Sequence, residues 1–283
     1  PVISMSREGL EIKGRQRFKE PGTFESMLAD LTNRFEKQMN ASQQTSVIAD
    51  LDVSQNKLTH EQWEGLFMTL TLASVKVMRF RLFGCATLDD AVLRIIADYF
   101  RQLTPETAPG EMHLSDCAIT SEGFQYFMGA IAEADFYPKP HPQMAGKGFP
   151  LYLRMENNYI TDSHIQENVD TGLIRRFVKE QGRAKTSGTV DLPGGAKIHL
   201  VCRFENGNFQ QKSGPPPAAD AAPPPKKIFD PHEASQQAQQ PQSWNMGWAP
   251  ALATQSWGWN GNWNNQAWGG QGAQNWGGQG GQN

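Results

Sequence analysis

Four segments in the middle of the chain share one pattern, which constrains the fold more than any other feature. They read LDVSQNKLT (51–59), FRLFGCATL (80–88), MHLSDCAIT (112–120) and LRMENNYIT (153–161). In each, two apolar residues are separated by one residue, and Asn or Cys follows after two more. Alternating apolar residues predict a short strand with one buried face. The fold must therefore place four short strands in similar positions, each with one face buried.

A helix is predicted after each of the first three strands. The stretches 60–73, 88–103 and 121–134 carry apolar residues at helical spacing, with Asp89 and Ser121 as expected N-caps. The insertion 135–150 contains prolines that forbid a helix, and we expect a loop there. Alternating strands and helices predict an α/β domain with a parallel sheet.

The strand pattern and the polar residue after it resemble the leucine-rich repeat, in the ribonuclease-inhibitor-like subtype, over about residues 46–175. Phe80 and Met112 replace the usual Leu, and Thr87 stands where Leu or Ile is usual. The resemblance implies a short solenoid of about four strand–helix repeats with a protein-binding concave face. The alternative is an unrelated α/β domain in which the alternation is accidental.

The polar residue that follows each strand is expected to bond backbone groups of the turn, inside the stack. We therefore predict structural roles for Asn56, Cys85, Cys117 and Asn158. The thiols of the two cysteines are not expected to act as nucleophiles.

The segments on either side of the repeats are expected to cap them. Residues 1–21 are interpreted as a solvated arm, and 22–45 as an amphipathic capping helix. The stretch 162–178 is expected to form another helix, broken at Gly172. Residues 176–212 are expected to form a C-terminal cap or hairpin, with two short strands around a Pro-Gly-Gly turn.

If the strands align, their outward positions form two columns on the concave face. The first column is Asp52, Arg81, His113 and Arg154, and the second is Ser54, Phe83, Ser115 and Glu156. Three members of the first column can be cationic, which suits an acidic or phosphorylated protein partner. The candidate partner-binding residues are therefore Asp52, Arg81, Phe83, His113, Arg154 and Glu156. The other interpretation is an ordinary solvated sheet face.

Catalytic, cofactor and metal sites are not predicted. The six histidines do not pair with Cys or His at metal-ligand spacing, and no phosphate-binding Gly loop is present. The odd count of three cysteines favours reduced thiols in an intracellular protein, in the cytoplasm or the nucleus. No apolar run approaches a membrane span, so no membrane partner is expected. The net charge of −3 argues against general adhesion to nucleic acid.

The last part of the sequence has a different composition. Residues 213–233 form a Pro/Ala-rich linker, expected to be an extended spacer. Residues 234–283 contain no Lys, Arg, Asp or Glu and consist largely of Gln, Asn, Gly and Trp, which predicts a disordered, prion-like tail. Its tryptophans are Trp244, Trp248, Trp257, Trp259, Trp263, Trp268 and Trp276.

Three hypotheses for these tryptophans stay open. They can stack on nucleic-acid bases, although the tail has no cation for phosphate. They can enter pockets of one partner by multivalency, and the tail resembles the GW/WG tails of Argonaute-binding silencing proteins. They can also drive self-association of the tail.

The sequence as a whole predicts a non-enzymatic interaction or scaffold protein. Its repeat domain would bind a protein partner, and its tail would add multivalent contacts within a ribonucleoprotein assembly, contacting RNA indirectly more than directly. The alternative is a direct RNA-binding protein that uses basic residues of the repeat face and the N-terminal arm, with Trp stacking.

Overall fold

A mostly parallel sheet runs through the protein. The computed structural model describes residues 2–41, 46–178, 188–202, 204–205, 208–209 and 211–218, and these all belong to one compact unit. The strand order is β1-β2-β3-β5-β6-β9-β12-β10, with β4 paired to β3. Its strands are β1 (Ile3–Met5), β2 (Leu10–Lys13), β3 (Val47–Asp52), β4 (Lys76–Val77), β5 (Arg79–Arg81), β6 (Glu111–His113), β9 (Leu151–Arg154), β10 (Ile174–Val178) and β12 (Ile198–Cys202). In this sheet β1 is antiparallel to β2, and every other described strand pair is parallel.

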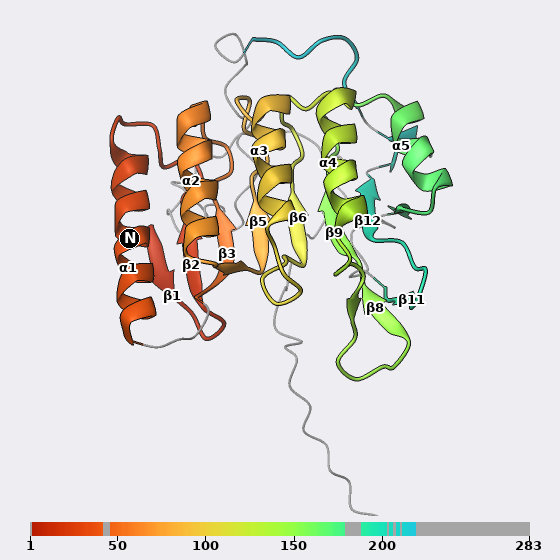
Figure 1. The fold of residues 1–283 in the computed structure, drawn as a ribbon. Helices are drawn as coiled ribbons and strands as arrows, with labels where there is room; N and C mark the ends of the chain where they lie inside the picture. Colours follow the sequence, from red (N-terminus) through yellow and green to blue (C-terminus); the bar gives the residue numbers. More distant parts are fainter. Residues whose placement is uncertain are drawn as a thin grey trace, which may run out of the picture. The chain divides into compact units, whose positions relative to one another are not determined.

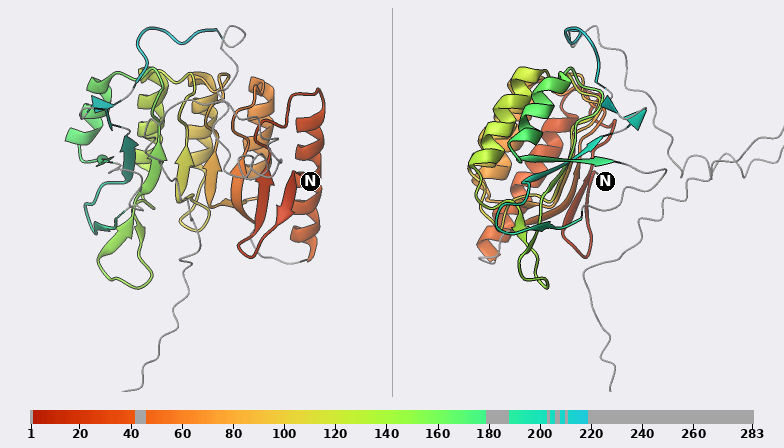
Figure 2. Two further views of the ribbon diagram at one scale, coloured as in Figure 1. Left: turned by 180° about the vertical axis from the view of Figure 1, so that it is seen from behind. Right: turned by 90° about the vertical axis from the view of Figure 1, so that its right-hand side faces the viewer.

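Five described helices lie side by side on one face of this sheet (Figure 1). They are α1 (Thr23–Ala41), α2 (His60–Leu72), α3 (Asp90–Arg101), α4 (Ser121–Glu133) and α5 (Asp162–Asp170). Seen from the side, the helices form one layer and the sheet a second (Figure 2). The predicted α/β class with a parallel sheet is therefore confirmed.

Helices α2, α3 and α4 begin where a side chain satisfies one of their free N–H groups. Thr59 and Gln62 form a reciprocal capping box at α2, and the Asp89 carboxylate accepts from the Val92 N–H at α3. At α4 the cap is Thr120, one residue before the predicted Ser121, which is the first residue of the helix.

The core lies between the two layers, and aromatic rings connect successive strand–helix units. Phe80 of β5 lies 6.0 Å from Phe67 of α2 and 6.0 Å from Tyr99 of α3, measured between ring centroids. Phe100 of α3 and Phe127 of α4 meet edge to face at 5.1 Å. Because each unit buries its apolar face against its neighbours, the units stabilise one another.

Two buried asparagines bond neighbouring strand ends together. Asn56 Nδ2 donates to the carbonyl of Gly14 after β2, at 2.9 Å, and to that of Val53 after β3, at 2.8 Å. Asn56 Oδ1 accepts from the Phe18 N–H at 3.0 Å. One side chain thus satisfies backbone groups of two adjacent turns, which would be costly to leave unpaired.

Asn158 makes the same connection three units later. Its Nδ2 donates to the Leu114 and Met155 carbonyls at 2.8 and 2.9 Å, and its Oδ1 accepts from the Ile119 N–H at 3.3 Å. Leu114 follows β6 and Met155 follows β9, so this asparagine also joins two strand ends.

The two cysteines occupy the equivalent places between the asparagines. Cys85 Sγ donates to the Val53 carbonyl at 3.6 Å, and Cys117 Sγ to the Leu82 carbonyl at 3.5 Å. Burial raises the pKa of the Cys85 thiol to about 12 and raises that of Cys117 as well. Both sulfurs therefore keep the proton that they donate, and neither is a thiolate nucleophile at neutral pH.

The residue before each of these four positions has a left-handed backbone, with φ between 57° and 69° at Gln55, Gly84, Asp116 and Asn157. The turn after each strand is thus the same one. Glycine adopts this conformation without strain, and at Gly84 a Cβ would also approach Gln55 Cγ to 3.0 Å.

The prediction of a solvated arm at residues 1–21 is wrong. Strands β1 and β2 extend the sheet, and Ile3, Leu10 and Ile12 are buried in the core. The reason is that LEIK alternates apolar and polar residues just as the later strands do. Helix α1, expected at residues 22–45 as a cap, follows β2 as the helix of one more strand–helix unit and lies at the end of the helical row (Figure 1).

The C-terminal part also differs from the prediction. The two strands around the Pro-Gly-Gly turn do not pair as a hairpin, because β12 inserts between β9 and β10 in the main sheet. The other strand, β11 (Val190–Asp191), joins β8 (Lys147–Phe149), which pairs with β7 (Lys139–Pro140), so the insertion 135–150 carries two strands. After Gly172 the chain continues as strand β10 and not as a helix.

The remaining described strands are β13 (Phe204–Glu205) and β14 (Asn208–Phe209), which pair with each other. The linker beyond residue 218 and the whole predicted tail, with its seven tryptophans, lie outside the described residues.

Replacing Asn56 by Ala should lower the free energy of unfolding by about 3 kcal/mol, because buried carbonyl and N–H groups lose their partner. The neighbouring exposed Lys57 supplies a matched control: Lys57→Ala should stay within about 0.5 kcal/mol of the wild type. Urea unfolding followed by circular dichroism measures both. Equal stability of the two variants would contradict the connecting role of Asn56.

Candidate interaction site on the sheet face

The sheet face away from the helices carries the predicted first column as one continuous row. Asp52 is in register with Arg81, Arg81 with His113, and His113 with Arg154. Lys13 of β2 adds one more residue, because it is in register with Asp52. The parallel register therefore places side chains of five strands about 4.8 Å apart along this row.

The second predicted column lies just beyond the strand ends, where backbone hydrogen bonds continue between neighbouring strands. The N–H groups of Gln55, Gly84 and Asp116 donate to the carbonyls of Phe83, Ser115 and Glu156, respectively. Ser54, Phe83, Ser115 and Glu156 therefore lie on adjacent strand ends. Phe83 is half-buried, whereas the side chain of Glu156 is only 2% exposed.

A third row, two residues earlier in each strand, was not predicted. Glu11 is in register with Asp50, and Arg79 with Glu111. Across the sheet the row comprises Glu11, Asp50, Arg79, Glu111, Tyr152, His199 and Arg175. Side chains two residues apart in a strand point to the same face, so these residues share the face of the first row. Extending the alternating pattern two residues toward the N-terminus in each strand would have identified them.

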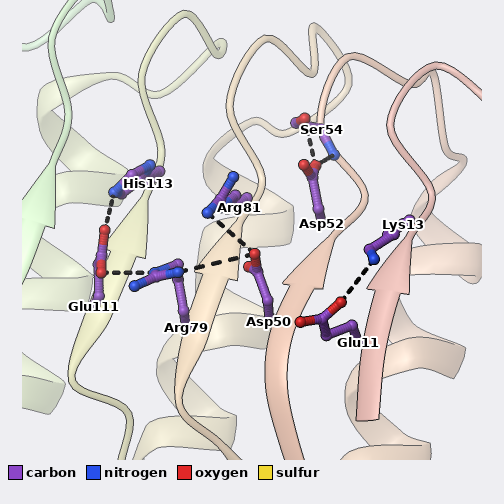
Figure 3. Close-up of polar contacts among 9 residues, drawn as sticks. All are labelled: Glu11, Lys13, Asp50, Asp52, Ser54, Arg79, Arg81, Glu111 and His113. Atoms are coloured by element: carbon purple, nitrogen blue, oxygen red, sulfur yellow. Dashed lines mark hydrogen bonds and ion pairs between the residues drawn. The ribbon is translucent and has the colours of Figure 1, made fainter. Parts of the chain in front are cut away.

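A chain of ion pairs and one hydrogen bond connects the first and third rows (Figure 3). Asp50 Oδ2 lies 3.1 Å from Arg81 Nη2 and 3.9 Å from Arg79 Nη1. Arg79 Nε lies 2.7 Å from Glu111 Oε2, and the other Glu111 oxygen lies 2.6 Å from His113 Nε2. Arg81 of the predicted patch is therefore already paired with an acid of the same face, and His113 is hydrogen-bonded to one.

The flanks of this chain are paired in the same way. Lys13 Nζ lies 2.7 Å from Glu11 Oε2, and Arg154 pairs with the buried Glu156. Asp52 accepts hydrogen bonds from the hydroxyl and the N–H of Ser54 (Figure 3). The face thus presents positive and negative groups in alternation, and not the cationic surface that the sequence suggested.

Burial and the neighbouring groups together set the protonation states in this network. Burial raises the pKa of Asp50 to about 6, because desolvation outweighs the attraction of Arg81 and Arg79. Burial also lowers the pKa of His113, despite the hydrogen bond to Glu111, so this ring is neutral at pH 7. Burial acts to raise the pKa of Glu111, but His113 and Arg79 outweigh it and hold the value at about 2.

Within the residues that the structure covers, no group of three or more His, Cys, Asp and Glu side chains is arranged to hold a metal ion. No described helix is both long enough and apolar enough to cross a bilayer. The chemistry that this face offers is reversible charge pairing and hydrogen bonding.

Comparison with known proteins adds little. No protein-family model matches the chain, and no curated protein matches it. Among solved structures it is similar to "Leiomodin-1 Actin-Binding Site 2 (ABS2)", with 15% sequence identity and a TM-score of 0.42, over 66% of this chain and 82% of that chain. A likeness of this degree carries no argument about function.

The two half-buried carboxylates, Asp50 and Glu111, should affect stability with opposite dependence on pH. The folded pKa of Asp50 is raised from 3.8 to about 6, so the native state binds more protons and loses stability as pH rises through that interval. Relative to wild type, Asp50→Asn should therefore gain about 2–3 kcal/mol between about pH 4 and pH 7.

Glu111→Gln is the matched control, since the Glu111 pKa is lowered from 4.5 to about 2. Its ionised form stabilises the fold above about pH 4.5, and that contribution is lost as pH falls toward 2. The variant should thus be about 3 kcal/mol less stable at neutral pH and approach wild type in acid. Urea unfolding at several pH values tests both, and parallel pH profiles for the two variants would contradict the assignment.

Proposed function

We propose that the chain is a non-enzymatic interaction protein whose domain is a short leucine-rich-repeat solenoid of the ribonuclease-inhibitor-like subtype. The sheet face would bind a protein partner, and the Trp-rich tail would add multivalent contacts within a ribonucleoprotein assembly. The observation that carries the proposal is the set of polar rows aligned across five strands.

The repeated turn supports the solenoid. Each of four strand ends has a left-handed residue followed by Asn or Cys, and the Asn or Cys bonds back to the preceding strand end. In a repeat protein each unit contacts its neighbours, and the shared face grows with each repeat. A partner can then contact several repeats at once.

The charges of the face favour a partner that itself carries both signs. Glu11, Asp50 and Asp52 lie on β2 and β3, and Arg79 and Arg81 lie on the adjacent β5. The three acidic residues on β2 and β3 would repel a uniformly acidic partner, and this repulsion would weaken binding. A basic group of the partner over β3 and an acidic group over β5 would complement both.

Removing single charges from the face tests this proposal. Asp52→Asn and Arg81→Gln should each weaken partner binding about tenfold, or 1.4 kcal/mol. Arg34→Gln, on the exposed surface of α1, removes a charge from the helical layer and is the matched control. Quantitative affinity purification with the full chain identifies partners, and titration of the strongest one measures the affinity.

The result that supports a face-bound partner is a loss of the same partners in both face variants, with the Arg34 variant unchanged. The proposal is overturned if both face variants retain every partner at wild-type yield, or if all three variants lose them equally. Thermal unfolding of each variant identifies any loss that comes from misfolding.

The tail has its own test, because its tryptophans lie outside the described residues. Replacing all seven tail tryptophans by Ala, or deleting residues 213–283, should remove the partners that need multivalent contact while the face-dependent partners remain. Replacing seven tail glutamines by Ala is the control and should remove none. Identical partner sets in all variants would contradict a binding role for the tail.

A further inference from the structure

Four basic residues gather at the carboxyl ends of β2 and β3. Arg15, Arg17 and Lys19 follow β2, and Lys57 follows β3. Their two loops lie side by side, since the N–H of Gln16 donates to the Ser54 carbonyl at 3.2 Å. The Phe18 N–H to Asn56 Oδ1 bond also joins them. We name these four residues the basic rim.

The basic rim differs from the sheet face because its charges are not neutralised. Within the described chain, none of its four cations lies in an ion pair with an acid, whereas Lys13, Arg79, Arg81 and Arg154 each do. Arg17, Lys19 and Lys57 are exposed, and Arg15 is half-buried. Glu20 and Glu61 follow the two loops in sequence, and Glu11 is paired with Lys13, so the four cations leave positive charge in excess.

An aromatic ring adjoins this charge. Arg15 Cζ lies 5.4 Å from the centroid of the half-buried Phe83 ring, and Arg15 Nε donates to Gln55 Oε1 at 2.9 Å. Gln16 Nε2 donates to the same oxygen at 2.8 Å, so two contacts fix the position of the Gln55 carboxamide. A flat guanidinium and a flat ring are thus held together at the end of β5. Both groups stack well on nucleobases.

The place in the fold also favours an anionic ligand. In open α/β sheets, ligands bind outside the carboxyl ends of the strands. Helices α1 and α2 begin after the same two loops, at Thr23 and His60, so the positive ends of their dipoles lie at this edge.

We propose that the basic rim and Phe83 bind a single-stranded polynucleotide, with the cations on its phosphates and the Phe83–Arg15 pair stacked on its bases. An acidic peptide would use the cations but not the stacking pair, and a duplex has no unstacked base to offer. The site shares Phe83 with the second column of the sheet face, but none of its four cations belongs to the paired rows, so the test by charge removal stands independently of the proposed protein partner.

The test measures fluorescence anisotropy of the full chain with labelled RNA and DNA single strands of the same sequence, about 16 nucleotides long. The rim variant combines Arg15→Gln, Arg17→Gln and Lys57→Gln. The control variant combines Arg34→Gln, Lys37→Gln and Lys147→Gln, which remove the same charge from other surfaces. Comparison of the RNA and DNA strands shows which polynucleotide is preferred.

Each phosphate contact of a single strand contributes about −0.7 to the slope of log affinity against log salt. The rim variant should therefore lose about 2 from that slope and at least tenfold in affinity, whereas the control variant should match wild type. Phe83→Leu should weaken binding about fivefold or more without changing the slope, since stacking contributes about 1–3 kcal/mol per base.

Three results would overturn the proposal. The first is the absence of single-strand binding by wild type. The second is an equal loss of binding in the rim and control variants. The third is equal affinity for a labelled polyglutamate peptide together with no effect of Phe83→Leu, which would assign the basic rim to an acidic protein instead. A duplex of the same sequence should bind more weakly than either single strand.

Discussion

Hydrogen bonds from four buried side chains at the strand ends hold this fold in register. Asn56, Cys85, Cys117 and Asn158 each donate to a carbonyl on the preceding strand end. A turn after a parallel strand leaves backbone groups that the helix above cannot reach, and burying them unpaired is costly. One amide or thiol at each turn satisfies these backbone groups, so the register between neighbouring strands is fixed. That register then sets the positions of the remaining side chains on the sheet face.

The face that results is ordered but nearly balanced in charge. Arg79, Arg81 and Arg154 have carboxylate partners on the same face, which favours the proposed recognition of a defined partner over a general attraction of polyanions. The unpaired cations of the basic rim lie instead at the carboxyl ends of β2 and β3, beside Phe83. Two surfaces of different chemistry thus arise from one repeated unit, the first within the strands and the second in the turns after them.

The sequence predicted the repeated strand, the helices after it and the alignment of Asp52, Arg81, His113 and Arg154, because all of these follow from local periodicity. It did not predict that β12 would insert between β9 and β10, since the pairing of distant strands is not encoded in spacing. The N-terminal strands were missed although LEIK alternates, because the basic residues around it suggested a solvated arm. The pairing of Arg81 with Asp50 was also missed, because Asp50 lies outside the aligned segments.

The most direct test of this account is amide hydrogen exchange at two residues. The N–H groups of Phe18 and Ile119 lie in turns and donate to Asn56 Oδ1 and Asn158 Oδ1, respectively. If these side chains hold the strand ends together, both amides should exchange as slowly as those of the core strands, through global unfolding alone. Exchange as fast as in the exposed loops would show that the strand ends open independently and that the register depends on something else.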